Sequence, residues 1–200
     1  MDMKNFDVLP VEKQLVVLNA GYTCFGKNGY KKTAMSEIAN QAGISKAALF
    51  HYFGTKKNLY FYLFGFACNE VLARSKEGNE DFFDCIELSI HIKMSVMEKY
   101  PNMFDFFNSI AVEVDTALLT ELKTTHGDAI NQWTTNLTRN VDWGRFLPHI
   151  GQEEAYNMIT WTIDGYVKMY HKQKNRQDMM IGLKHYLNVL KKAIYKEEYQ

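Results

Sequence analysis

The sequence predicts an all-α protein, because apolar residues recur along its 200 residues at a spacing near 3.6, the repeat of an amphipathic helix. Alternation of apolar and polar residues with a period of two, which indicates a half-buried strand, is not evident over five or more residues. Hydrophobic residues make up 46% of the chain, enough for one sizeable core or for a small module docked on a larger one.

The first predicted helix begins at Pro10, a residue that suits the first helical position. Leu15 and Leu18 mark its apolar face, and we expect Gly26 and Gly29 to close it. Glycine is favoured just past a helix end because it accepts backbone angles that other residues avoid. Two shorter helices are expected to follow.

Each of these two short helices is preceded by a residue that can cap it. Thr33 is expected to cap the second helix, which Gly43 ends. Ser45 is expected to cap the third, which is too short to be stable without packing against its neighbours. A turn between two short helices is the geometry that places one of them in a DNA groove.

A long fourth helix is expected from about 56 to 76, capped by Thr55 directly after Gly54. The chain therefore predicts a helix-turn-helix domain at 1–55 and a larger helical domain at 56–200. Within the larger domain, further helices are expected at 81–100, 116–140, 152–174 and 178–198. A short Phe-rich segment, Phe104 to Phe107, follows the first of them, and a loop is expected at 142–151.

The third helix, at Ser45, has two distinct faces. Ala48, Leu49 and Tyr52 lie on one side, where they can pack against the preceding helix. The opposite side carries a cation, a small residue and two rings: Lys46, Ala47, Phe50 and His51. This mixture suits contacts with phosphates, base edges and thymine methyl groups.

The charge of the chain is polarised, although its net charge is zero. The segment 1–57 holds eight lysines and four acidic residues, so it carries +4 and the remainder carries −4. Helix amides freed at Thr33 and Ser45 are expected to attract phosphate, and Lys56 with Lys57 to add a cationic clamp. Each feature alone also fits a merely solvated surface, and helix-turn-helix geometry occurs in many proteins that bind no DNA. Their coincidence in one short block favours DNA binding.

These residues resemble the TetR-like bacterial transcriptional regulators over about Leu15 to Leu63. The resemblance rests on Phe25-x-x-x-Gly29-Tyr30, Thr33-Ala-Met-Ser-Glu-Ile38-Ala39, Ala42-Gly43-Ile44-Ser45-Lys46-Ala-Ala-Leu49-Phe50-His51-Tyr52-Phe53 and Gly54-Thr55-Lys56-Lys57-x-Leu59. It implies contacts with DNA from Thr33, Lys46, Ala47, Phe50, His51, Tyr52 and Lys56, beside the Ser45 helix start. Phe50 stands where many members have Tyr, and Lys57 where Glu is common.

The resemblance also implies that the long helix joins the DNA-binding domain to a helical domain that binds a small effector and dimerises. An apolar or aromatic effector is expected at a pocket of bulky side chains: Phe64, Met97, Phe104, Phe107, Trp133, Trp161 and Tyr166. His91, Asn108 or Asp164 is expected to orient it. From composition alone, the same aromatic and methionine residues are assigned to plain core first, so the pocket rests on the resemblance.

A homodimer is expected, because one short recognition helix offers too few contacts for specific binding and such dimers bind two half-sites. The last two helices, at about 152–198, are the candidates for the interface. Their apolar stripes could form half of a four-helix bundle between two copies: Leu183, Leu187, Leu190 and Ile194 with Ile159, Ile163, Val167 and Tyr170. The same stripes could instead close the chain's own core.

Other function classes have less support. The six histidines form no metal-ligand pair, the three cysteines suggest neither a disulfide framework nor a zinc site, and no phosphate-cradling or nucleophile motif appears. We therefore expect no catalytic residue, metal or cofactor. The longest apolar run has ten residues, about half of what a membrane-spanning helix needs, so no membrane span is expected. The N-terminus shows no signal-peptide pattern, so we expect a cytoplasmic protein. The alternatives are a helical small-molecule-binding protein or enzyme with an apolar aromatic pocket, and a helical dimer whose basic block binds protein.

Overall fold

The computed structural model describes residues 4–75, 78–111, 113–170 and 176–200. These ranges fold into α-helices joined by turns and two short 3-10 segments, and they contain no strand beyond one isolated bridge between Phe146 and Tyr195. The prediction of an all-α protein is confirmed. Among the helices so described, none is long and apolar enough to cross a membrane.

The chain divides into two compact units, which are described separately. The first holds Met1–Lys76 and Ser89–Asn136, and the second holds Glu77–Leu88 and Leu137–Gln200. Helix α6, Phe82–Lys99, is split between the two units, and α8, Thr116–Thr138, lies almost wholly in the first.

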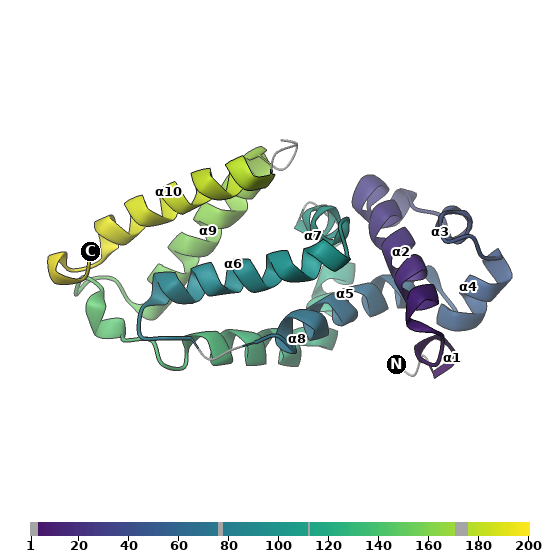
Figure 1. Ribbon diagram of the computed structural model, residues 1–200, viewed down its shortest axis with the longest axis horizontal. Coiled ribbons are helices and arrows are strands. Elements are labelled where there is room, and N and C mark those ends of the chain that lie inside the picture. The colour runs from purple at the N-terminus through teal and green to yellow at the C-terminus, as the bar shows by residue number, and fades with distance from the viewer. Residues whose placement is uncertain (1–3, 76–77, 112, 171–175) are drawn as a thin grey trace. The chain divides into compact units, whose positions relative to one another are not determined.

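The first unit begins with a short helix that the sequence patterns did not indicate, α1, before the three expected helices (Figure 1). Helix α1 is Lys4–Asp7. Besides α8 and part of α6, the unit holds α2 (Val11–Lys32), α3 (Met35–Gln41), α4 (Lys46–Phe53), α5 (Lys56–Leu72) and α7 (Met103–Ala111). Phe6 of α1 is fully buried, 4.8 Å from the ring of Phe53, so α1 covers the end of α4.

An aromatic core holds α2, α5 and α7 of this unit together. Phe25, Tyr60 and Phe106 are fully buried or nearly so, with the Tyr60 ring 4.9 Å from that of Phe25 and 5.2 Å from that of Phe106. Tyr22 is also buried, and its hydroxyl donates to the backbone carbonyl of Leu63 at 2.9 Å. Each such ring contributes roughly 2 kcal/mol by burial, so this core fixes α5 against α2.

Two details of α2 differ from the sequence prediction. Gly26 does not close the helix, which continues through it. A glycine is needed at position 26 because α7 passes close by: a Cβ on Gly26 would lie 2.9 Å from the backbone nitrogen of Phe106. Gly29 does break the helix, with a φ of 72°. Thr33 caps the end of α2 rather than the start of α3, and Ala34 precedes α3 without a side-chain cap.

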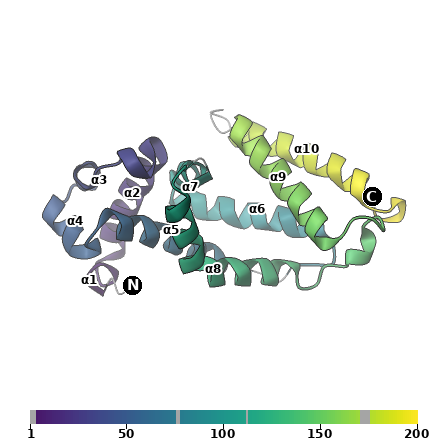
Figure 2. The ribbon, with the colours of Figure 1, turned by 180° about the vertical axis from the view of Figure 1, so that it is seen from behind.

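The second unit contains an antiparallel pair of helices, α9 (Gln152–Tyr170) and α10 (Arg176–Ile194), which lie side by side in both views (Figures 1 and 2). The expected loop at 142–151 carries a 3-10 turn at Trp143–Arg145, and a second turn, Glu197–Tyr199, ends the chain. The buried apolar residues of α9 and α10 include Ile159, Leu183, Leu187 and Ile194.

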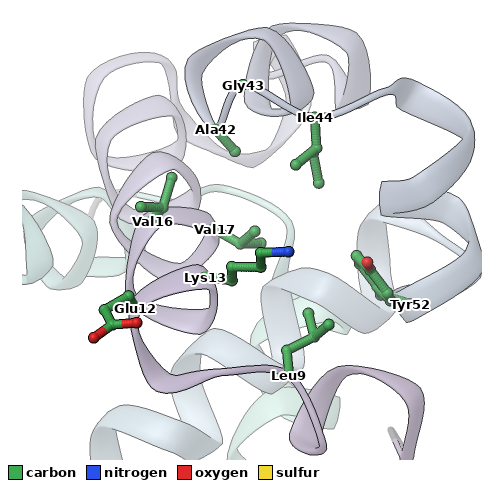
Figure 3. Close-up of a pocket in the computed structure, with 9 residues that line it drawn as sticks. All are labelled: Leu9, Glu12, Lys13, Val16, Val17, Ala42, Gly43, Ile44 and Tyr52. Atoms are coloured by element: carbon green, nitrogen blue, oxygen red, sulfur yellow. The ribbon is translucent and has the colours of Figure 1, made fainter.

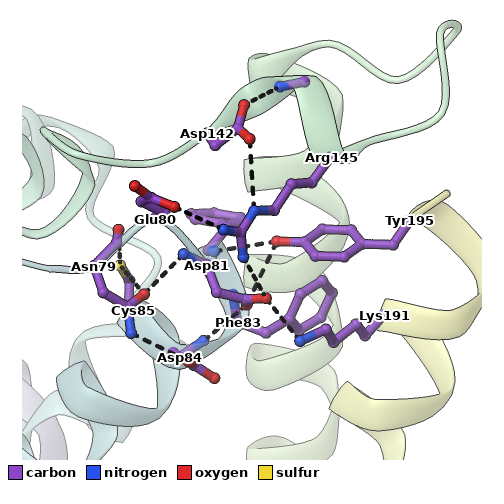
Figure 4. Close-up of polar contacts among 12 residues, drawn as sticks. Asn79, Glu80, Asp81, Phe83, Asp84, Cys85, Asp142, Arg145, Lys191 and Tyr195 are labelled. Carbon is purple, nitrogen blue, oxygen red and sulfur yellow. Dashed lines mark hydrogen bonds and ion pairs between the residues drawn. The ribbon is translucent and has the colours of Figure 1, made fainter. Parts of the chain in front are cut away.

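A buried ionic network, here named the Asp81 cluster and made of Asp81, Arg145, Lys191 and Tyr195, stabilises the second unit (Figure 4). The Asp81 carboxylate is 7% exposed and accepts from Lys191 Nζ at 2.8 Å and from Arg145 Nη1 at 3.4 Å. The Tyr195 hydroxyl accepts from the backbone amide of Phe82 at 3.1 Å. The cluster therefore joins the start of α6, the loop after α8 and the end of α10.

Burial by itself raises the pKa of the Asp81 carboxyl. The hydrogen bond from Lys191 and those from two backbone amides outweigh burial, so the pKa of Asp81 lies below its ordinary value. Burial raises the pKa of the Tyr195 hydroxyl, and the charge of Asp81 raises it further. Asp81 is thus held ionised beside a neutral Tyr195.

Candidate DNA-binding site

The turn between α3 and α4 depends on one glycine. Gly43 has a φ of 65°, in the left-handed region that residues with a Cβ rarely adopt. The Gly43 amide donates to Asn40 and the Ile44 amide to Ala39 at 3.0 Å, which closes the end of α3. Only residues 42–45 separate the end of α3 from the start of α4.

Both ends of α4 carry the caps that the sequence predicts. The Ser45 side chain accepts from the Ala48 amide at 3.0 Å, and Gly54 ends the helix with a φ of 71°. Thr55 then caps α5, accepting from the Asn58 amide at 3.0 Å. Because these bonds are local, they fix the length of α4 at Lys46–Phe53 without help from distant residues.

The inner face of α4 is anchored by Leu49 and Phe53, which are fully buried or nearly so. Ala48 and Tyr52, the other residues predicted to face inward, are half-buried, and the Tyr52 ring lies 5.8 Å from that of Phe6. The prediction omitted Phe53, although its position four residues after Leu49 marks it as part of the same face.

The outer face of α4 is open to solvent. The residues predicted to contact DNA from this face are all exposed: Ser45, Lys46, Ala47, Phe50 and His51. Phe50 is 38% exposed, and Lys46 Nζ lies 5.8 Å from the centre of its ring. A cation and an apolar ring are thus presented together on a rigidly anchored helix, which is the combination that phosphate and base contacts need.

Two other predicted contact residues have partners inside the domain. Thr33 is 2% exposed, and its hydroxyl donates to the backbone carbonyls of Gly29 at 2.7 Å and Cys24 at 3.0 Å. Lys56 Nζ donates to three backbone carbonyls near the end of α2. The side chains predicted to reach DNA from these positions are therefore occupied, and their contact with DNA stays a prediction.

Lys57, the second residue of the expected cationic clamp, also has a partner. Its ammonium pairs with the carboxylate of Glu121 on α8 and lies 5.5 Å from the ring of Phe61. The Lys57 charge is therefore paired with a carboxylate, whereas Lys46 is exposed on the outer face of α4.

A shallow pocket of about 430 Å³ lies behind α4 (Figure 3). It is bounded by the start of α2, the turn after α3 and the inner side of α4. Its lining is mostly apolar and consists of Leu9, Glu12, Lys13, Val16, Val17, Ala42, Gly43, Ile44 and Tyr52. None of the residues predicted to bind an effector lines this pocket.

The residues predicted to bind an effector fall in both units. Phe64 and Phe107 pack edge to face at 5.7 Å in the first unit, where Met97, Phe104 and Trp133 are half-buried. Trp161 and Tyr166 belong to the second unit. Trp161 is 68% exposed, and Tyr166 packs 5.5 Å from Tyr186 of α10. The effector role of these seven residues stays a prediction.

Sequence reasoning missed His126 of α8, which lies against α5. A Cβ added at Gly65 would meet the imidazole, so the ring rests directly on the α5 backbone, with the Phe64 ring 5.4 Å away. Burial lowers the pKa of His126, and its Nε2 is buried without a hydrogen-bond partner. No spacing in the sequence indicates this contact, because it depends on how α8 packs on α5.

The stripes proposed for a dimer interface are partly used within one chain. Four of these residues are buried within the chain's own core, the second of the two uses expected for them: Ile159, Leu183, Leu187 and Ile194. The side chain of Tyr170 lies outside the part of the chain that the structure describes. Other apolar residues of α9 and α10 are exposed on the same two helices: Tyr156, Trp161, Met169, Ile181, Tyr186 and Val189.

Within the described ranges, no three His, Cys, Asp or Glu side chains gather closely enough to hold a metal ion. The three cysteines are free, with Cys24 and Cys85 buried and Cys68 half-buried. Burial raises the pKa of the Cys24 and Cys68 thiols to about 11, which makes both poor nucleophiles.

Comparison with known proteins agrees with this geometry. The family described as "Bacterial regulatory proteins, tetR family" matches residues 17–63, the segment that contains α3, the turn and α4. The chain is 26% identical over 164 residues to the HTH-type transcriptional repressor AcnR of Corynebacterium efficiens, covering 79% of this chain and 81% of AcnR. It is 32% identical over 97 residues to the HTH-type transcriptional regulator RutR of Escherichia coli K12, covering 48% of this chain and 46% of RutR.

The fold is shared with solved structures over most of the chain. The transcriptional regulator FadR from Bacillus subtilis, solved in complex with stearoyl-CoA, superposes with a TM-score of 0.64 at 18% identity, covering 88% of this chain and 96% of FadR. The capped recognition helix, the matched segment and this likeness lead to one assignment. The chain is a DNA-binding transcriptional regulator whose residues 17–63 match the TetR family.

Proposed function

We propose that this protein is a ligand-responsive repressor that binds a palindromic operator as a homodimer. The observation that carries the proposal is the outer face of α4, where Lys46, Ala47, Phe50 and His51 are exposed while Leu49 and Phe53 anchor the inner face. A free protein gains nothing from an exposed Phe beside a Lys, whereas a groove of DNA offers both a phosphate and a thymine methyl group. The name of the AcnR relative supports repression.

Each exposed side chain has a role that its chemistry permits. Lys46 neutralises a phosphate, Ala47 and Phe50 contact thymine methyl groups or sugar, and His51 hydrogen-bonds a base edge or phosphate. The amides at the start of α4, next to Ser45, add a phosphate contact. Tyr52 is half-buried, so it supports the edge of this surface more than its centre.

The dimer is proposed through 152–198, on the exposed apolar surface of α9 and α10. Trp161, Ile181 and Val189 are each more than half exposed, and burial of such side chains against a second copy would stabilise the dimer. Two recognition helices held in this way would read two half-sites.

A small apolar or aromatic effector is proposed for the larger domain, which we place at 56–200, beside a DNA-binding domain at 1–55. The FadR structure holds stearoyl-CoA, in which a long apolar acyl chain is joined to a charged CoA group, and the acyl chain supports the apolar effector class. The candidate contacts are Phe64, Met97, Phe104, Phe107, Trp133, Trp161 and Tyr166. The effector would act by binding one spacing of the two recognition helices better than the other. As a regulator the protein would be cytoplasmic and would catalyse no reaction.

Selection of bound sequences from random DNA tests the proposal directly. The expected result is an inverted repeat, since each half-site should match one α4. A selected single half-site would contradict the dimer, and the absence of any enriched sequence would contradict operator binding itself. A His51→Ala variant is the matched control, because it should weaken or broaden the enriched motif without altering the fold.

The effector is tested by thermal shift with the wild-type protein and a set of saturated fatty acids and planar aromatic compounds. A compound that raises the melting temperature should also release the selected operator. If compounds stabilise the protein but leave operator binding unchanged, they are not effectors of repression.

A further inference from the structure

Lys56, the first residue of α5, binds backbone carbonyls of the DNA-binding domain instead of facing solvent. Its Nζ donates to the carbonyls of Tyr30 at 2.9 Å, Thr33 at 3.2 Å and Lys31 at 3.3 Å. The same ammonium lies 4.6 Å from the centre of the Tyr30 ring. Lys56 is half-buried in this position.

The three carbonyls are available because of the break at Gly29. The last carbonyls of a helix have no partner within it, and the φ of 72° at Gly29 turns the chain just before Tyr30 and Lys31. Thr33 then directs its carbonyl to the same side as it leads into α3. A lysine ammonium is tetrahedral and carries three N–H donors, so it can satisfy three such carbonyls at once.

The same geometry leaves Lys56 without a donor for phosphate. Each of its three N–H groups has a carbonyl partner, whereas Lys46 on the outer face of α4 is exposed. A contact from Lys56 to DNA would require these bonds to break. Two lysines ten residues apart in the matched segment thus have different environments.

We propose that Lys56 is a positioning residue for operator binding. It ties the first turn of α5 to the end of α2 and to the entry of α3, and so fixes the helix-turn-helix relative to α5. The Tyr30 ring strengthens this tie, because it packs 4.9 Å from the ring of Tyr60 on α5. The inference rests on the proposed function as an operator-binding protein, and it concerns how the recognition helix is held, not what it contacts.

The test compares Lys56→Met with Lys46→Met, since both substitutions remove one ammonium and keep an unbranched side chain. Each variant is titrated with the selected operator and with a scrambled duplex of equal length, over a range of salt concentrations. For Lys46→Met, we expect weaker binding to both duplexes and a salt slope reduced by about 1, because a phosphate contact is independent of sequence. For Lys56→Met, we expect about tenfold weaker operator binding with unchanged scrambled-DNA binding and unchanged salt slope.

A second variant, Lys56→Gln, separates positioning from charge. Its amide is uncharged but still donates to carbonyls, so operator affinity should recover part of the loss seen with Lys56→Met. If both Lys56 variants reduce the salt slope by about 1 and weaken scrambled-DNA binding, Lys56 contacts phosphate and the proposal is overturned. It is also overturned if Lys56→Met is folded by circular dichroism and binds the operator as the wild type does.

Failure of this inference differs from failure of the proposed function. If the wild-type protein enriches no DNA sequence, operator binding is wrong for the whole protein. In that case the tie itself remains measurable by amide hydrogen exchange: Lys56→Met should speed exchange at 37–41 in α3, and Lys46→Met should not. Equal exchange in both variants would overturn the structural role of Lys56.

Discussion

The recognition helix α4 and the Asp81 cluster use charged side chains in opposite ways. On α4, Lys46 and His51 are exposed on a face whose stability comes from Leu49 on the other side. In the Asp81 cluster, Lys191 and Arg145 are turned toward one buried carboxylate. The first arrangement keeps charge available to a partner, and the second uses charge to join three segments of the same unit.

The comparison teaches that residue type alone does not tell a binding lysine from a structural one. Three lysines show this. Lys56 donates to three backbone carbonyls and Lys191 to a carboxylate, whereas Lys46 has no hydrogen-bond partner among the described residues. What differs is the supply of acceptors around each one. Substitutions should therefore separate folding from DNA binding cleanly.

The largest effect is expected at the Asp81 cluster. Asp81→Ala leaves Arg145 and Lys191 facing each other without the carboxylate, and we expect the free energy of unfolding to fall by about 3 kcal/mol. Chemical denaturation measures it. Asp84→Ala is the matched control: Asp84 is exposed, and its loss should cost less than about 1 kcal/mol. Equal losses for the two variants would mean that the cluster is not a stabilising network.

The next effect is expected on α4, and it should appear in DNA binding alone. Lys46→Ala should weaken operator binding about tenfold, the order expected for one charged contact, with a salt slope lower by about 1. Its melting temperature should stay within a degree or so of the wild type, because exposed substitutions change stability little. A large fall in melting temperature would show that Lys46 is structural, and the contrast with Lys191 would disappear.

A smaller effect is expected from acid. The pKa of Asp81 is lowered in the folded protein, so its stabilisation is fully present above the unfolded pKa, about 4, and is lost as the pH falls through the lower folded value. The difference in unfolding free energy between the wild type and Asp81→Asn should therefore be constant above about pH 5 and shrink below pH 4. A difference that grows as the pH falls would contradict the paired state of Asp81.

The smallest effect is expected at Phe50, where the resemblance places Tyr in many family members. Phe50→Tyr should strengthen operator binding about threefold if its hydroxyl reaches a phosphate, the order of one hydrogen bond. Phe50→Leu is the control, since it keeps an apolar contact and adds no donor. A loss of affinity with Phe50→Tyr would mean that the ring faces a thymine methyl group or another apolar surface.

Local features of this molecule could be predicted from sequence, and features that depend on distant packing could not. The caps at Ser45 and Thr55 and the turn at Gly43 involve residues within a few positions of one another, so the sequence shows them directly. The carbonyl partners of Lys56 could not be predicted, because they lie 23 to 26 residues away in sequence and become available through the break at Gly29. The Asp81 and Lys191 pair spans 110 residues, and no spacing rule connects them.

The aromatic residues show the same limit. Phe106 and Trp161 look alike in a composition, yet Phe106 is fully buried and Trp161 is 68% exposed. Each stands on a helix with apolar periodicity, and only the packing of neighbouring helices decides which side of that helix is covered. The sequence therefore predicts the residues of an effector pocket less directly than it predicts those of the recognition helix.

Gly26 has a consequence for how motion passes through the first unit. Because α7 approaches the backbone of α2 there without a side chain between them, and Asn102 hydrogen-bonds Thr23 beside it, the two helices share a stiff seam. Flexible side chains normally absorb small shifts between helices by changing rotamer, and α2 has no side chain at Gly26 that could do so. A displacement of α7 should therefore reach α2, and with it the start of the DNA-binding domain, almost undamped.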